Sequence, residues 1–92
     1  MTREKAVIIV VGNDRPGIIA AISGRLAGVD VNILDITQTT MHGLFTMITL
    51  ADITECAVSF NELATSLEQT GRGIGVSVAV WHEDIFNAMH RI

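Results

Sequence analysis

The segment AVIIVVGNDRPGI, residues 6–18, joins a continuous apolar run to a polar, glycine-containing loop and then to a helical pattern. Its first six residues are rich in β-branched side chains, which is typical of a central strand covered on both faces. Asp14 is predicted to cap the following helix. Apolar residues recur every four positions from Ile18 to Leu26, as on the buried side of a helix. The segment therefore predicts a strand, a loop and a helix that ends near Gly28.

The middle of the chain has the pattern of a β-hairpin. Residues 31–40 are enriched in β-branched side chains, and residues 41–43, Met-His-Gly, supply a turn. Residues 44–51 then form a second apolar run of strand length. We expect these two strands to pair.

A second helix and a last strand complete the pattern. Ser59 and Glu62 have the spacing of a capping box, which marks the start of a helix. The helix is predicted to stop at Gly71, where a glycine would adopt a left-handed conformation, and the GRGIG stretch at 71–75 is predicted to be a flexible turn. Alternating valines over residues 76–81 predict a strand with one buried face.

The closing residues, 82–92, predict a short tail helix with Ile85, Met89 and Ile92 along one side. The order of elements is thus βαββαβ followed by a helix. This is the α+β, ferredoxin-like arrangement, in which two helices cover one face of a four-stranded antiparallel sheet. We expect residues 1–92 to form a single domain of this class.

The uncovered face of such a sheet predicts self-association. In the strand at 44–51, Ile48 and Leu50 can point to one face while Phe45 and Met47 point to the other, and we expect Phe45 and Met47 to face away from the helices. The chain is 49% hydrophobic, and a domain of this size buries only about 60% of its unfolded surface. An exposed apolar face of this kind indicates a homodimer or a higher even oligomer.

Charge and composition exclude several classes of protein. The formal net charge of −4 disfavours nucleic acid as a partner, because it repels phosphate backbones. No apolar run approaches the roughly 20 residues that span a bilayer, so no membrane association is expected. The single cysteine, Cys56, and the absence of a signal-peptide core predict a cytoplasmic protein.

The loop at residues 12–18 is the strongest candidate for a binding site. The free N–H groups at the start of the following helix favour a carboxylate, while Asn13 and Asp14 can hold an ammonium group nearby. This polarity suits a free amino acid. In the alternative interpretation, Asp14 only caps the helix, and Gly12 and Gly17 only allow the turn.

A wider resemblance is carried by Asn13-Asp14-Arg15-Pro16-Gly17-Ile18 between a strand and a helix, followed by Val31-Asn32-Ile33 at the opening of the next strand. This pattern resembles an ACT domain over essentially the whole chain. With the tail EDIFNAMHRI, the chain is similar to single-domain ACT proteins of prokaryotes. The resemblance implies a non-enzymatic regulatory module that acts on an unidentified protein and binds an amino acid or a similar effector between subunits. It implies contacts from the first loop and the start of the second strand, namely Asn13, Asp14, Gly17, Ile18, Asn32 and Ile33.

Other functions remain open at the level of the sequence. A dimer that regulates another protein without a small-molecule ligand explains the apolar sheet equally well. An acylphosphatase-like hydrolase would use Arg15 to hold phosphate and Asn32 to orient water, although Asp14 would repel that substrate. No catalytic residue and no cofactor are predicted. No metal site is predicted either, because the four candidate ligands lack the close pairing typical of zinc sites: His42, His82, His90 and Cys56.

Overall fold

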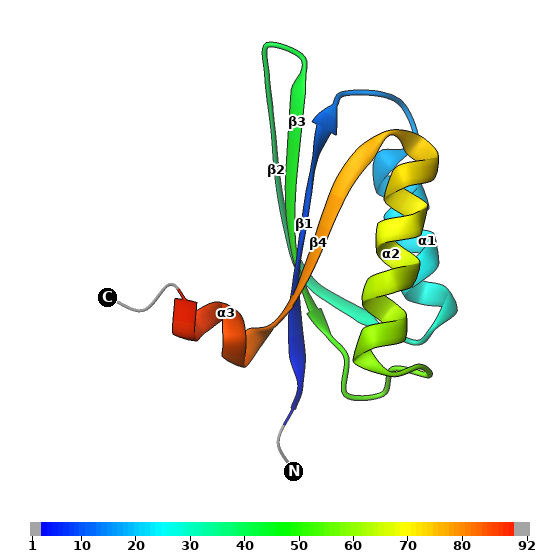
Figure 1. Cartoon of the computed structure of the whole chain (residues 1–92), viewed down its shortest axis with the longest axis vertical. Coiled ribbons are helices and arrows are strands. Elements are labelled where there is room, and N and C mark those ends of the chain that lie inside the picture. The colour runs from blue at the N-terminus through cyan, green and yellow to red at the C-terminus, as the bar shows by residue number, and fades with distance from the viewer. Residues whose placement is uncertain (1–2, 90–92) are drawn as a thin grey trace.

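The computed structural model describes residues 3–89, and these residues form a two-layer fold with a further helix on the opposite side (Figure 1). The elements, in chain order, are β1 (Lys5–Asn13), α1 (Ile18–Gly28), β2 (Asn32–Met41), β3 (Leu44–Asp52), α2 (Phe60–Ile74), β4 (Val76–His82) and α3 (Glu83–Met89). The sheet has the order β2-β3-β1-β4, and every neighbouring pair is antiparallel. The predicted ferredoxin-like βαββαβ arrangement with a short C-terminal helix is confirmed.

The core lies between the sheet and the two helices α1 and α2. Phe45 and Met47 belong to this core, with exposed fractions of 5% and 1%, so the prediction that they face away from the helices is wrong. The strand register explains the orientation, because Met47 pairs with Val10, another core residue. Both faces of β3 are apolar, so the alternation of the sequence could not assign them. The apolar side chains on the other face are those of Leu44, Ile48 and Leu50, of which Leu44 and Ile48 are exposed.

The second helix continues beyond its predicted end. It begins as predicted, because the N–H of Glu62 donates to Oγ of Ser59 at 3.2 Å. It ends at Gly75, which has a φ of 78°, and the predicted stop at Gly71 is wrong. A Cβ atom added at Gly71 would lie 2.5 Å from Cγ2 of Val78. Gly71 therefore lets α2 approach β4 closely, and the GRGIG stretch is mostly helix instead of a flexible turn.

The third helix, α3, lies against β1 and β4 on the face that α1 and α2 leave free (Figure 1). None of its residues is buried, and Ile85 and Met89 are 54% and 53% exposed. The predicted tail helix is confirmed for these two residues, whereas Ile92 and His90 lie outside the described residues. The half of this face formed by β2 and β3 carries no helix from the described part of the chain.

Candidate ligand-binding site

A cavity of about 380 Å³ lies where β1 ends and α1 begins. Its lining comes from four parts of the chain: the first loop, the first turn of α1, β2 and β3. The lining residues are Asp14, Arg15, Gly17, Ile18, Ile19, Ala20, Gln38, Thr40 and Phe45. The cavity therefore joins the loop indicated by the sequence to the end of the sheet's edge strand, β2.

Asp14 does not cap α1, so this part of the sequence prediction is wrong. The helix starts after Gly17, whose φ of 88° is left-handed, and no side chain caps it. The backbone N–H of Asp14 instead donates to the carbonyl of Gly43 at 2.8 Å, which ties the first loop to the β2–β3 turn. Within residues 3–89, no hydrogen bond or ion pair involves the carboxylate of Asp14. Both this carboxylate and the first N–H groups of α1 are thus available to a ligand.

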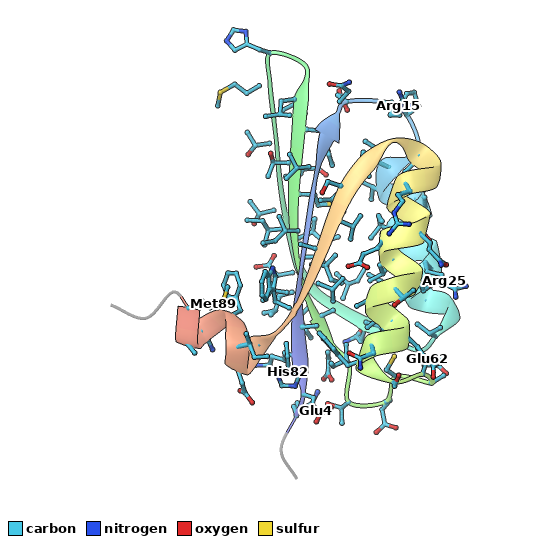
Figure 2. The ribbon with its side chains drawn as sticks, viewed as in Figure 1. Glu4, Arg15, Arg25, Glu62, His82 and Met89 are labelled. Atoms are coloured by element: carbon cyan, nitrogen blue, oxygen red, sulfur yellow. The ribbon has the colours of Figure 1, made fainter. Side chains whose placement is uncertain are left out.

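Arg15 brings a positive charge to the same cavity. Its guanidinium packs over the end of α2, since Nη1 lies 3.3 Å from the position of a Cβ added at Gly75 (Figure 2). The partial negative charge of a helix C-terminus favours a cation there. Because Asp14 and Arg15 both line the cavity, its mouth carries two opposite charges.

The walls of the cavity differ in polarity. Ile18 and Phe45 are buried and apolar, whereas Gln38 and Thr40 present an amide and a hydroxyl from β2. An α-amino acid has the complementary groups: an ammonium for a carboxylate, a carboxylate for helix N–H groups or a guanidinium, and a side chain for the apolar wall.

The six residues implied by the family resemblance lie in two places. Asp14, Gly17 and Ile18 line the cavity, and Asn13 directly precedes them at the end of β1. Asn32 and Ile33 lie at the other end of the sheet. Asn13 pairs with Leu44 and Asn32 pairs with Asp52, eight residues further along β3, which corresponds to about 27 Å. One chain alone does not bring the two groups together.

Sequence reasoning missed Gln38 and Thr40. Thr40 could have been predicted from the turn at 41–43, because counting residues outward from that turn along both strands pairs Thr40 with Phe45. That pairing puts both β2 side chains on the helix side of the sheet, where the cavity lies.

The charges at the opposite end of the sheet hold the fold together. Nη1 of Arg3 donates to Oδ2 of Asp52 at 2.8 Å, and the N–H of Thr54 donates to Oδ1 at 2.9 Å. The Thr54 hydroxyl and N–H, followed by Arg3, lower the pKa of Asp52 below its ordinary value of 3.8, against the opposing effect of burial. This carboxylate is engaged in tying the start of β1 to the end of β3.

The described part of the chain also contains a cysteine, histidines and acidic side chains, the residue types that bind metals. No group of three or more His, Cys, Asp or Glu side chains comes together there as a metal-binding set. Cys56 is a free, half-buried thiol packed against the core. None of the helices formed by residues 3–89 is long and apolar enough to cross a membrane.

Comparison with known proteins identifies the family. Residues 4–80 match the ACT domain family. The UPF0237 protein of Methanopyrus kandleri is 49% identical over 92 residues, which cover 100% of both chains. Among solved structures, the ACT domain protein from Streptococcus pneumoniae superposes with a TM-score of 0.81 at 34% identity, covering 92% of this chain and 96% of that one. The ACT domain from the GTP pyrophosphokinase of Chlorobium tepidum has a TM-score of 0.61 at 28% identity, covering 86% and 99%. The chain is a member of the ACT domain family, whose members are typically regulatory modules that bind small molecules.

Proposed function

We propose that this chain is a non-enzymatic regulatory module that binds a free amino acid at a homodimer interface and acts on a separate protein. The observation that carries the proposal is the first loop, where the Asp14 carboxylate and the uncapped start of α1 line one cavity. Asp14 is exposed, so its carboxylate is hydrated in the free chain and accessible to a ligand. Arg15 adds the second charge that a zwitterion requires.

The dimer that we propose pairs β2 of one subunit with β2 of the other. β2 spans ten residues at the edge of the sheet, and no other strand of the described region pairs with its outer side. Such an edge favours pairing with another strand. In an antiparallel pair related by a two-fold axis, the start of one β2 lies beside the end of the other. Asn32 and Ile33 of the partner subunit would then approach Thr40, at the cavity, and the two separated groups would form one site.

The surface of α1 supports this arrangement. The helix lies against β2, and its only charged residue is Arg25. Ile19, Ala20 and Ala27 are exposed on it. A helix that is apolar on its outer side as well as its inner side is typically covered by a second partner. Pairing of the two β2 strands would supply that partner as α1 of the other subunit.

A thermal-shift screen of the free amino acids tests the proposal. Ligand at 100 times its dissociation constant stabilises the native state by about 2.7 kcal/mol, which raises the melting temperature of a domain of this size by roughly 10 °C or more. Asp14→Asn should reduce the shift, while the control Asp30→Asn, which changes the same charge at the other end of α1, should not. Equal shifts in the two variants would place the site elsewhere.

The exposed apolar side chains Leu44 and Ile48 support a second candidate, a dimer that regulates another protein and binds no small molecule. A screen in which no amino acid stabilises the protein would favour it. The acylphosphatase-like alternative requires Arg15 and Asn32 to act on one substrate, but within one chain these residues lie at opposite ends of the sheet.

A further inference from the structure

A groove of about 620 Å³ lies between the C-terminal half of α2 and β4, the last strand of the sheet. Two charged side chains of α2, Glu68 and Arg72, line one wall. The other wall is formed by Gly75 and by residues 76–78 of β4. α2 packs against β4 here, as Figure 1 shows. The groove therefore lies at the β4 edge of the sheet.

β4 is an edge strand whose outer side is open. In the sheet order β2-β3-β1-β4, its only partner among the described strands is β1. Alternate N–H and C=O groups of such a strand point away from the sheet, and proteins usually protect them with prolines, charged side chains or bulges. β4 has the sequence VSVAVWH, without proline, Asp, Glu, Lys or Arg, and its register with β1 is continuous. This edge is therefore suited to accept a further strand.

We infer that this edge and the groove bind an extended segment of the protein that the module regulates, which adds to the sheet antiparallel to β4. The inference rests on the proposed function in one respect, namely that the module acts on a separate protein. In strand addition, main-chain hydrogen bonds give affinity and the side chains of the added strand give specificity. The proposed homodimer uses β2, at the opposite edge of the sheet, so β4 stays available in the dimer.

The spacing of the two charges on α2 specifies the segment. Glu68 and Arg72 are four residues apart on the helix, or about 6 Å along its axis. Residues two apart on a strand point to the same side and are separated by about 6.7 Å. Two side chains of the added strand can therefore meet both charges. Within residues 3–89, neither side chain takes part in a hydrogen bond or an ion pair, so both are accessible to the segment.

The chain direction determines the order of these two side chains. α2 and β4 meet at Gly75, so Arg72 lies near the start of β4 and Glu68 lies farther along it. Val76 and Val78 are buried in the core beneath α2, and residues paired with them would face the same side of the sheet. In an antiparallel strand, the residue opposite Val78 comes two positions before the residue opposite Val76. The segment therefore has a basic residue followed two positions later by an acidic one.

The groove adjoins the ligand cavity through Arg15. This residue lines the cavity, and its Nη1 lies 3.3 Å from the position of a Cβ added at Gly75, which lines the groove. Binding of an amino acid that contacts Arg15 can therefore change this end of the groove, and regulation of a partner requires such a link between two sites.

Two heptapeptides of the same composition, acetyl-TVTVKVE-amide and acetyl-TVTVEVK-amide, test the inference. Aligned antiparallel to β4, they exchange the Lys and Glu that lie opposite Val78 and Val76. An NMR titration of isotope-labelled protein, with no amino acid present, measures both affinities and the residues affected. The TVTVKVE peptide should bind about fivefold or more tightly, because two exposed charge pairs change from attraction to repulsion in the other peptide. It should also slow the hydrogen exchange of alternate β4 amides.

The double variant Glu68→Arg and Arg72→Glu reverses the two charges and leaves the net charge unchanged. It should reverse the preference between the peptides, while circular dichroism checks that it is folded. Equal affinity of the wild type for both peptides, no binding of either at millimolar concentration, or an unchanged preference in the folded variant would overturn the inference. Alternate β4 amides that already exchange slowly in the free protein would show that a second copy occupies the edge, which would overturn it as well.

The peptide titration and the amino acid screen separate this inference from the proposed function. If the peptides bind as expected although no amino acid stabilises the protein, the groove stands and the proposed binding of an amino acid fails. If an amino acid binds and neither peptide does, the groove fails and the ligand site stands.

Discussion

Replacing Gly71 by alanine should destabilise the protein, although alanine is the better helix former. The added Cβ would lie 2.5 Å from Cγ2 of Val78 and 3.0 Å from the carbonyl oxygen of Val76. The second contact is with backbone and is not relieved by a side-chain rotation. Forcing a methyl group into such a contact costs about 1–3 kcal/mol, while the helical preference of alanine returns up to about 1 kcal/mol.

Gly73 supplies the matched control, because it lies two residues further along α2 and a Cβ added there would meet nothing within 4 Å. Gly73→Ala should therefore be neutral or stabilising. The gain in helical preference is the same in both variants, so the difference in their stabilities isolates the cost of the contact, about 1–3 kcal/mol or roughly 4–24 °C in melting temperature. Thermal and urea unfolding of both variants measure this difference. Equal stability of the two would refute the close approach of α2 to β4.

Three further perturbations test the packing and the electrostatics. Thr49→Val should raise the free energy of unfolding by about 1 kcal/mol, because Oγ1 of Thr49 is buried with no hydrogen-bond partner among residues 3–89; denaturant unfolding measures it, and a loss of stability would reveal a partner. The hydrogen bonds from Thr54 depress the pKa of Asp52, so they stabilise the fold fully above pH 3.8 and less as the pH falls through the lower folded-state pKa. The stability of the wild type should therefore fall more steeply with acid than that of Asp52→Asn, and parallel curves would contradict this. Met47→Glu should unfold the protein while Ile48→Glu remains folded by circular dichroism, because Met47 is 1% exposed and Ile48 is 45% exposed.

Periodicity in the sequence was sufficient for the order of the elements but not for the orientation of β3. The runs that predict β1, α1 and the β2–β3 hairpin are each marked by β-branched composition or helical period and end in glycine or polar residues. β3 is apolar on both faces, so the face of Phe45 and Met47 is decided by pairing with β1, which is a long-range contact. In the same way, Gly71 and Gly75 are equally good candidates to end α2, and only the position of β4 distinguishes them.

The candidate site could be predicted in part for the same reason. The loop from Asn13 to Ile18 is continuous in sequence, and its polar groups were visible there. The contribution of Gln38 depends on the position of β2 beside α1, which no local pattern contains. Asp14 fits an N-cap in sequence, but the left-handed Gly17 moves the start of α1 beyond its reach.

A binding site shared between two subunits can be tested by mixing two variants that are each defective in it. If each site takes Asp14 from one subunit and Asn32 from the other, both sites are impaired in a homodimer of Asp14→Asn chains. The same holds for a homodimer of Asn32→Ala chains. In a mixed dimer, the intact Asp14 of one chain meets the intact Asn32 of the other.

The measurement is a calorimetric titration of the two variants, unfolded and refolded together in equal amounts, with the amino acid that gives the largest shift in the thermal screen. Random pairing makes half of the dimers mixed, and each of these has one intact site. Wild-type affinity is expected at about a quarter of all sites in the mixture, and at none in either variant alone. A mixture that binds no better than the separate variants would contradict a site shared between subunits.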